Sequence, residues 1–274
     1  MSRKNWTYDK LFFRLLNNKS KNTYWENIGE LRRRPNNEVH SRAVQLSKSK
    51  IEKEKIIGID VLAQLGFDPR FKQKETIDIY FELLQEEQTP KVLGSILSGI
   101  GHNNENLTDK QIQKLCEFEC HNFSDVRFSL VHALSRVENK NAIQVIINLS
   151  QDKHPEVRDW ATFALGSQIE ITNEKIINAL WDRLGDEFTN VRFEAIAGLA
   201  NRKDKRIKEI LIQELKEIDN HGSLILESIE SLNDKDFIEL IEKQIKKNKE
   251  TKKVNEKWLL DCIEKLKTNA QQKI

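Results

Sequence analysis

The stretch VRDWATFALG, from Val157 to Gly166, decides the fold because close copies of it recur along the chain. Two of these copies read VRFSLVHALS and VRFEAIAGLA, and three more are weaker. The six copies begin at Ile57, Val92, Val126, Val157, Val191 and Leu224. Their spacings lie between 31 and 35 residues. Self-similarity at a nearly constant period predicts a repeat protein.

Each copy has the periodicity of a helix. In the central copy Val157, Ala161, Ala164 and Leu165 fall on one helical face. The seventh residue after the first is small in most copies, which lets two helices approach closely: Gly99, Ala133, Ala164, Gly198 and Ser231. Second amphipathic segments lie between the copies, at 76–84, 110–118, 142–149, 175–184 and 207–215. The repeat is therefore a helix–turn–helix unit that buries its apolar face by stacking on its neighbours.

The residues before each copy predict helix starts. Pro90 and Pro155 stand two residues before the first residue of their copies, where proline suits the first turn of a helix. Ser124 and Thr189 hold the same position in other copies, and we expect them to act as N-caps. Five residues before the first residue of a copy, an acidic side chain recurs in all copies but one: Glu52, Glu87, Asp152, Asp186 and Asp219. An acid there is favoured by the helix dipole.

An acid, a Val-Arg pair, an alanine three residues later and a final Leu-Gly make a pattern that resembles the HEAT repeat of bacterial proteins. The copies at Val157 and Val191 match it best, and the resemblance spans roughly residues 36–246. It implies an all-α, right-handed α-solenoid of about six to seven repeats, with the second helix of each repeat on the concave face. It also implies protein binding or scaffolding as the usual role.

A ladder of arginines and aspartates follows from the same pattern. Arginine stands directly after the first valine only in the middle copies, whereas Gly58, Leu93 and Ile225 replace it elsewhere. We interpret these residues as a structural ladder that ties repeats together: Arg127, Arg158 and Arg192 with Asp152 and Asp186. The alternative is that the arginines bind phosphate or carboxylate groups.

The ends differ from the repeats. Residues 1–35 carry apolar residues at helical spacing and end at Pro35, so we predict N-terminal capping helices there. The repeat solenoid is expected over residues 36–267, with a disordered tail at 268–274. The basic run Lys246–Lys253 is interpreted as a solvated loop or frayed helix, and Arg32–Arg34 as solvated surface.

Charge is unevenly distributed along the chain. Residues 1–60 hold 14 Lys and Arg against 7 Asp and Glu, and residues 241–274 hold 10 against 5. Because the whole chain has a formal charge of +2, residues 61–240 carry −10. A duplex-binding protein needs a basic track, so this acidic body argues against nucleic acid as the partner.

Two rows of residues along the stack point to a binding surface. One row reads Asp60, Ser95, Ser129, Trp160, Glu194 and Glu227, and the other reads Ala63, Ser98, His132, Phe163, Ala197 and Glu230. Most members are small or polar, so Trp160 and Phe163, one turn apart, stand out as aromatic anchors. We predict a partner-binding concave face made of Trp160, Phe163, His132, Glu194, Glu227 and Glu230. The alternative is that both rings pack between repeats.

Metal sites and catalysis find little support in the sequence. Cys116 and Cys120 are four residues apart and His121 follows, but a zinc site usually has four ligands and no second pair exists. We interpret the cysteines as buried and free, and we predict no metal and no cofactor. Glycine-rich phosphate loops, nucleophile elbows and HExxH motifs are missing, so no catalytic residue is assigned and the chain is expected not to be an enzyme.

These features favour a cytoplasmic scaffold or adaptor that holds a protein with a basic patch, and an immunity-type or regulator role would fit. The residues after Met1 lead into no long apolar run, and no stretch approaches 18 apolar residues, so neither a signal peptide nor a membrane span is expected. One alternative is an enzyme that acts on nucleic acid like HEAT-like DNA glycosylases, through Trp160 and Asp159. Another is a chromophore lyase, by analogy with phycobilin lyases of similar repeats.

Overall fold

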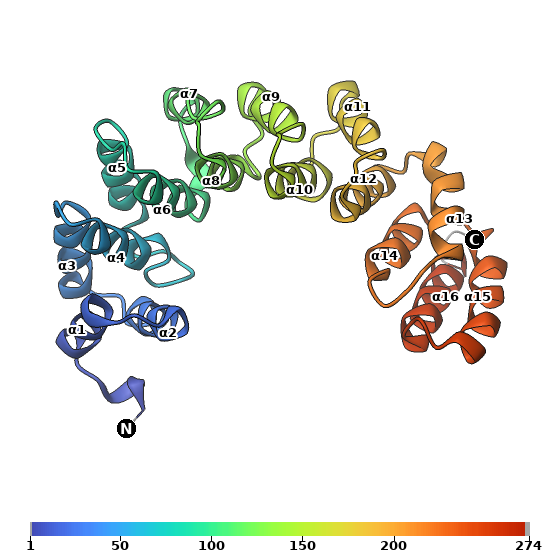
Figure 1. Cartoon of the computed structure of the whole chain (residues 1–274), viewed down its shortest axis with the longest axis horizontal. Helices are drawn as coiled ribbons and strands as arrows, with labels where there is room; N and C mark the ends of the chain where they lie inside the picture. Colours follow the sequence, from blue (N-terminus) through green and yellow to red (C-terminus); the bar gives the residue numbers. More distant parts are fainter. Residues whose placement is uncertain (1, 272–274) are drawn as a thin grey trace. The chain divides into compact units, whose positions relative to one another are not determined.

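The computed structural model describes residues 2–271 (Figure 1). Within that range the secondary structure is helical and contains no β-strand. The longer helices are α1 (Tyr8–Asn17), α2 (Lys21–Arg32), α3 (Asn37–Ser47), α4 (Glu52–Ala63), α5 (Gln73–Leu83), α6 (Pro90–Gly101), α7 (Asp109–Cys116), α8 (Ser124–Leu134), α9 (Lys140–Leu149), α10 (Pro155–Phe163), α11 (Glu174–Arg183), α12 (Thr189–Asn201), α13 (Lys208–Lys216), α14 (Ser223–Leu232), α15 (Phe237–Thr251) and α16 (Glu256–Gln271). Short 3-10 segments are η1 (Arg3–Asn5), η2 (Asn104–Asn106) and η4 (Lys205–Ile207), and the π-helical segment η3 spans Ala164–Gln168.

The chain divides into two compact units, Met1–Val145 and Ile146–Ile274. In the first unit α4 packs on α3 and α6, and α6 packs on α8. In the second unit α10 packs on α12, α12 on α14, and α14 on α16. In each unit of Figure 1 the helices that carry the repeated stretch stack on one another, and the intervening helices form a second row. The predicted all-α solenoid of helix pairs is confirmed.

The predicted apolar face is the core of the stack. Val157, Ala161, Ala164 and Leu165 are all fully buried. The expected close approach also occurs, because a Cβ added to Gly198 of α12 would lie 2.6 Å from the Cα of Gly166. Glycine at Gly198 therefore lets the two backbones meet at this crossing.

Helix starts agree with the sequence in part. Pro155 is the first residue of α10, as Pro90 is of α6, which confirms the role expected of both prolines. The expected N-cap role is wrong for Ser124 and Thr189, because each is already the first helical residue and the residue before it is the cap. Those caps are phenylalanines, which make no side-chain capping bond.

Local turns explain why an acid recurs five residues before each copy. Its carboxylate accepts a hydrogen bond from the backbone N–H two residues later. Four of the acids make this bond: Glu87 to Thr89 at 2.8 Å, Asp152 to His154 at 2.8 Å, Asp186 to Phe188 at 3.0 Å and Asp219 to His221 at 2.8 Å. The acid therefore orders the turn that leads into the helix.

Helices occur at the N-terminal end, where they were predicted, and the C-terminal end contains more helix than expected. Residues 1–35 hold α1 and α2, and these helices belong to the first unit. The basic run Lys246–Lys253 continues α15 as far as Thr251. A disordered tail was predicted over residues 268–274. Residues 268–271 contradict that prediction because they continue α16, and residues 272–274 lie outside the described residues.

Candidate binding surface

The repeat that carries Trp160 has a local irregularity. Helix α10 ends at Phe163 and passes into the π-helical segment η3, where the Ile169 N–H donates to the Ala164 carbonyl at 3.0 Å. Between residues 2 and 271 no other segment is π-helical. Single π-helical turns occur frequently at functional sites, so this repeat differs from the others in backbone as well as in side chains.

Trp160 and Phe163 form an edge-to-face pair on α10. Their ring centroids are 5.7 Å apart and the ring planes meet at 82°. Trp160 is 41% exposed, whereas Phe163 is half-buried. Trp160 is therefore a surface side chain supported by Phe163, and the alternative of two core rings does not describe it.

Three carboxylates of the second unit, those of Asp159, Glu194 and Glu227, interact electrostatically. Asp159 precedes Trp160, and its Oδ1 is buried with no hydrogen-bond partner among the described residues. Burial and then the charge of Glu156 raise the pKa of Asp159. Burial, Asp159 and Glu227 together raise the pKa of Glu194 to about 7. A positive charge placed among these carboxyl groups would favour their ionised forms, so the surface suits a cationic ligand.

Two predicted members of the surface lie elsewhere or are neutralised. His132 belongs to the first unit, where its ring packs edge-on against His102 with centroids 4.9 Å apart. Glu230 forms an ion pair with Lys265 of α16 at 2.7 Å. Extending the rows by repeat period takes no account of α16, which does not carry a clear copy.

Asp159 is the residue that the predicted surface lacked. The sequence singled it out only for the nucleic-acid alternative. Its position next to Trp160 was a usable signal, because an acid beside an aromatic anchor shares the anchor's environment. The carboxylates of Asp159, Glu194 and Glu227, with Trp160 and Phe163, are called the acidic aromatic surface below.

The three ladder arginines share one contact that the sequence did not reveal. In each case Nη1 donates to the main-chain oxygen six residues earlier. The distances are 2.7 Å from Arg127 to His121, 2.9 Å from Arg158 to Asp152 and 2.9 Å from Arg192 to Asp186. Each arginine therefore closes the turn before its helix, which for Arg158 and Arg192 is the turn that the acid orders, so these guanidinium groups have a structural role.

Arg158 also reaches the next repeat. Its Nε and Nη2 donate to the two carboxylate oxygens of Asp186 at 2.8 and 2.9 Å. Burial would raise the pKa of Asp186, but the bonds from Arg158 and from the Phe188 N–H outweigh burial and lower that pKa. The guanidinium of Arg158 also lies over the Phe188 ring at 5.4 Å.

The first unit has a buried polar cluster centred on Asp60. Tyr24 donates to its carboxylate at 2.6 Å and Ser95 at 3.2 Å, while Arg32 donates to its main-chain oxygen at 3.0 Å. Burial raises the pKa of Asp60. This cluster links α2, α4 and α6 through hydrogen bonds, so it holds α2 on the first repeats.

The cysteines are less buried than expected. Cys116 is half-buried and Cys120 is exposed, so the prediction of buried cysteines is wrong for Cys120, while Cys262 is buried. Helix α7 ends at Cys116, and the two thiols therefore do not share a helical face. The described residues contain no group of three or more His, Cys, Asp or Glu that could hold a metal ion.

Comparisons with known proteins agree with this architecture. The HEAT repeats family matches residues 112–200 and 145–233. Protein YibA of Escherichia coli K12 is 34% identical over 124 residues, which are 45% of this chain and 44% of YibA, so the match spans less than half of that relative. No helix among the described residues is long and apolar enough to cross a membrane.

Solved structures show the same fold. The X-ray structure of the Escherichia coli YibA protein superimposes with a TM-score of 0.72 at 24% identity, covering 96% of this chain and 93% of that chain. A crystal structure of an engineered protein gives a TM-score of 0.53 at 16% identity, covering 94% of this chain and 77% of that one. At these identities the likeness concerns architecture alone.

Proposed function

We propose that this chain, whose middle is built of HEAT repeats, is a protein-binding scaffold or adaptor that works in the cytoplasm. The observation that carries the proposal is Trp160, which is 41% exposed although it lies in the best copy of the repeat. The same position holds small or acidic residues in the other copies. A large, partly exposed ring at this position suits recognition of a partner.

The chemistry of the acidic aromatic surface specifies the partner. Tryptophan is the best aromatic acceptor of a cation, and nearby carboxylates add charge-assisted hydrogen bonds. Asp159 offers a buried carboxylate oxygen without a hydrogen-bond donor. We therefore propose a protein partner that inserts lysine or arginine side chains, such as a target with a basic patch that an immunity or regulator protein would cover.

Nucleic acid is a poorer candidate for this surface. The glycosylase alternative relies on Trp160 and Asp159, but Glu194 acts electrostatically on Asp159 and, with Glu227, adds negative charge that repels phosphate groups. The ladder arginines are bonded within the repeats and supply no basic track. The chromophore-lyase alternative has no specific contact in its favour.

The proposal is tested with a defined probe and with the native cell extract. The probe is an acetylated and amidated Gly-Arg-Gly-Arg-Gly peptide, whose binding is followed by titration calorimetry. We expect saturable binding that is lost when Trp160→Ala is combined with Phe163→Ala. Affinity purification with the same variant should lose the partner that the unmodified protein retains.

Matched variants separate binding from folding. Leu260→Ala removes another exposed apolar side chain of the second unit and should leave binding unchanged. Helical circular dichroism and the melting temperature of the double variant should stay close to those of the unmodified protein. A large loss of stability would instead assign the rings to the core, and unaltered binding would refute the proposed surface.

A further inference from the structure

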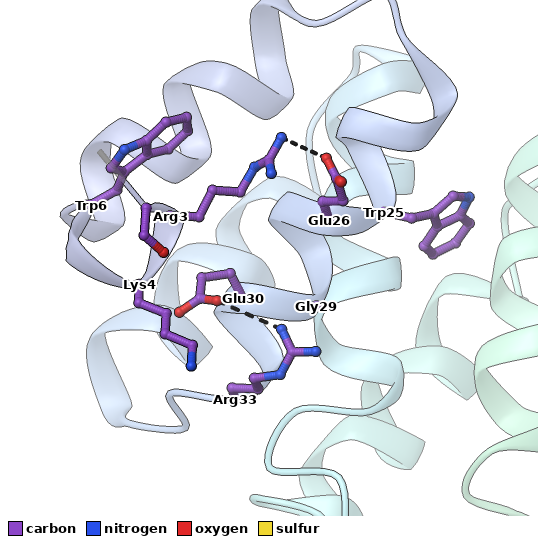
Figure 2. A pocket seen from close by; sticks show the side chains of 9 residues that line it. Arg3, Lys4, Trp6, Trp25, Glu26, Gly29, Glu30 and Arg33 are labelled. Carbon is purple, nitrogen blue, oxygen red and sulfur yellow. Dashed lines mark ion pairs between the residues drawn. The ribbon is translucent and has the colours of Figure 1, made fainter.

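An open pocket of about 540 Å³ lies in the first unit, between η1 and α2. It is lined by Arg3, Lys4, Trp6, Glu26, Glu30 and Arg33 (Figure 2). Its volume falls within the range of about 300 to 1,000 Å³ that is typical of ligand pockets. It shares no residue with the acidic aromatic surface and is called the N-terminal pocket below.

The hydrogen-bond donors of the N-terminal pocket exceed its acceptors. Arg3 pairs with Glu26 at 2.5 Å, and Arg33 lies 3.6 Å from Glu30 while its side chain remains 61% exposed. Figure 2 shows both arginines directed toward these carboxylates. Lys4 has no ion-pair partner among the described residues.

Trp6 adds a hydrogen-bond donor that is already shielded from water. Its Nε1 is buried and has no hydrogen-bond partner in the described part of the chain. An unpaired buried N–H costs stability unless a ligand supplies an acceptor. The face of the same ring is covered by the Lys10 ammonium at 4.5 Å from the centroid, so stacking of a ligand on that face is blocked.

The walls of the pocket are fixed by one arginine that lies behind them. Arg34 donates to the main-chain oxygens of Trp6 at 2.8 Å, Arg3 at 2.9 Å and Lys4 at 2.7 Å. Its Nε also donates to the buried carboxylate of Glu30 at 2.9 Å. These bonds tie η1 to α2 without a ligand, so little order has to be gained on binding.

We propose that the N-terminal pocket binds a carboxylate group, carried by a small organic acid or by an acidic side chain of a peptide. Three cationic and two anionic side chains line it, which leaves one positive charge. That balance matches a single carboxylate, whereas a phosphate dianion would face repulsion from Glu26 and Glu30. The Lys4 ammonium and the half-engaged Arg33 guanidinium supply donors that two carboxylate oxygens accept, and Trp6 in the pocket wall carries a further N–H that has no acceptor among the described residues.

The experiment follows the Trp6 indole N–H by NMR in the full chain, with its resonance assigned by Trp6→Phe. The probes are glutarate, an acetylated and amidated Gly-Glu-Gly-Glu-Gly peptide, and inorganic phosphate. We expect at least one carboxylate probe to shift the Trp6 resonance downfield and saturably, with phosphate weaker. Glutarate alone would identify a small acid as the source, and the blocked peptide alone would identify a protein segment.

Variants test whether the carboxylate probes bind through the pocket or through the overall basic charge of the segment. Lys4→Gln combined with Arg33→Gln should weaken the carboxylate probe by about tenfold or more, since charge-assisted hydrogen bonds are lost. Lys19→Gln changes charge in the same basic segment outside the pocket and should alter affinity by less than about twofold. Equal losses in both variants, tighter binding of phosphate, or no saturable shift with either carboxylate probe would overturn the proposal.

Discussion

Arg158 and Asp186 form a two-pronged ion pair between adjacent repeats, with N–O distances of 2.8 and 2.9 Å. Their side chains are only 9% and 5% exposed. The remaining terminal nitrogen of the same guanidinium donates to the main-chain oxygen of Asp152. One side chain therefore closes the turn of its own repeat and fixes the next repeat against it.

Removing Arg158 should destabilise the second unit more than a surface ion pair would. Arg158→Ala leaves the Asp186 carboxylate buried without its cation, and breaking a buried pair in this way costs about 3 kcal/mol of unfolding free energy. Urea denaturation followed by circular dichroism measures the loss. Lys243→Ala breaks the exposed pair with Glu239 and serves as the control, which should leave the midpoint nearly unchanged. Equal midpoints for the two variants would show that the buried pair is not a stabilising link.

The repeat architecture could be predicted because stacking constrains many residues in the same way. Val157, Ala161 and Leu165 are buried, as are their counterparts in every other copy except the last, where Leu224 is half-buried. Burial requires apolar side chains at helical spacing. A small residue at the seventh position was also predictable from the pattern, and at Gly198 two backbones meet there.

The candidate surface could be predicted only in part, because it depends on what one repeat does differently. Trp160 was visible as an exception to its row, but the π-helical segment after Phe163 leaves no recognisable mark in the sequence. The pairing of Glu230 with Lys265 joins residues 35 positions apart, through a helix outside the clear repeats. Contacts of that kind depend on packing geometry that repeat period does not encode.

Gly198→Ala should destabilise the second unit through a clash with backbone. The new Cβ would lie 2.6 Å from the Cα of Gly166 and 3.0 Å from a Leu180 methyl group. Backbone cannot move aside without separating η3 from α12, so we expect a loss of about 2 kcal/mol. Gly185→Ala is the matched control, because nothing lies within 4 Å of its Cβ. A thermal melt in which both variants behave alike would contradict the tight crossing.

Glu194→Gln should stabilise the protein at alkaline pH. The pKa of Glu194 is raised from its ordinary value of 4.5 to about 7 by burial and by the charges of Asp159 and Glu227. Between these two values the folded protein holds a proton that the unfolded chain has lost, so stability falls as pH rises through this window. Because glutamine does not ionise, the substitution removes this loss of stability. Partial exposure of the side chain limits the gain in unfolding free energy to about 1 kcal/mol at pH 8.

Comparison of two pH values tests the origin of this gain. Below pH 4.5 the wild-type side chain is protonated in both states, so the difference between wild type and Glu194→Gln should vanish there. Melting temperatures of both proteins at pH 4 and pH 8 provide the measurement. A gain of equal size at both pH values would mean that packing, and not charge, separates the two side chains.

Binding of a cationic partner should depend on pH through the same carboxyl group. At pH 8 Glu194 is ionised and attracts the blocked Gly-Arg-Gly-Arg-Gly peptide, whose arginines keep their charge throughout. At pH 6 the group is mostly protonated, so we expect affinity to fall, by at most about tenfold per pH unit. Titration calorimetry at both pH values should show this fall in the wild type and not in Glu194→Gln. Glu230→Gln changes a carboxyl group already paired with Lys265 and should keep the wild-type dependence, whereas a pH dependence that survives in Glu194→Gln would assign it to another group.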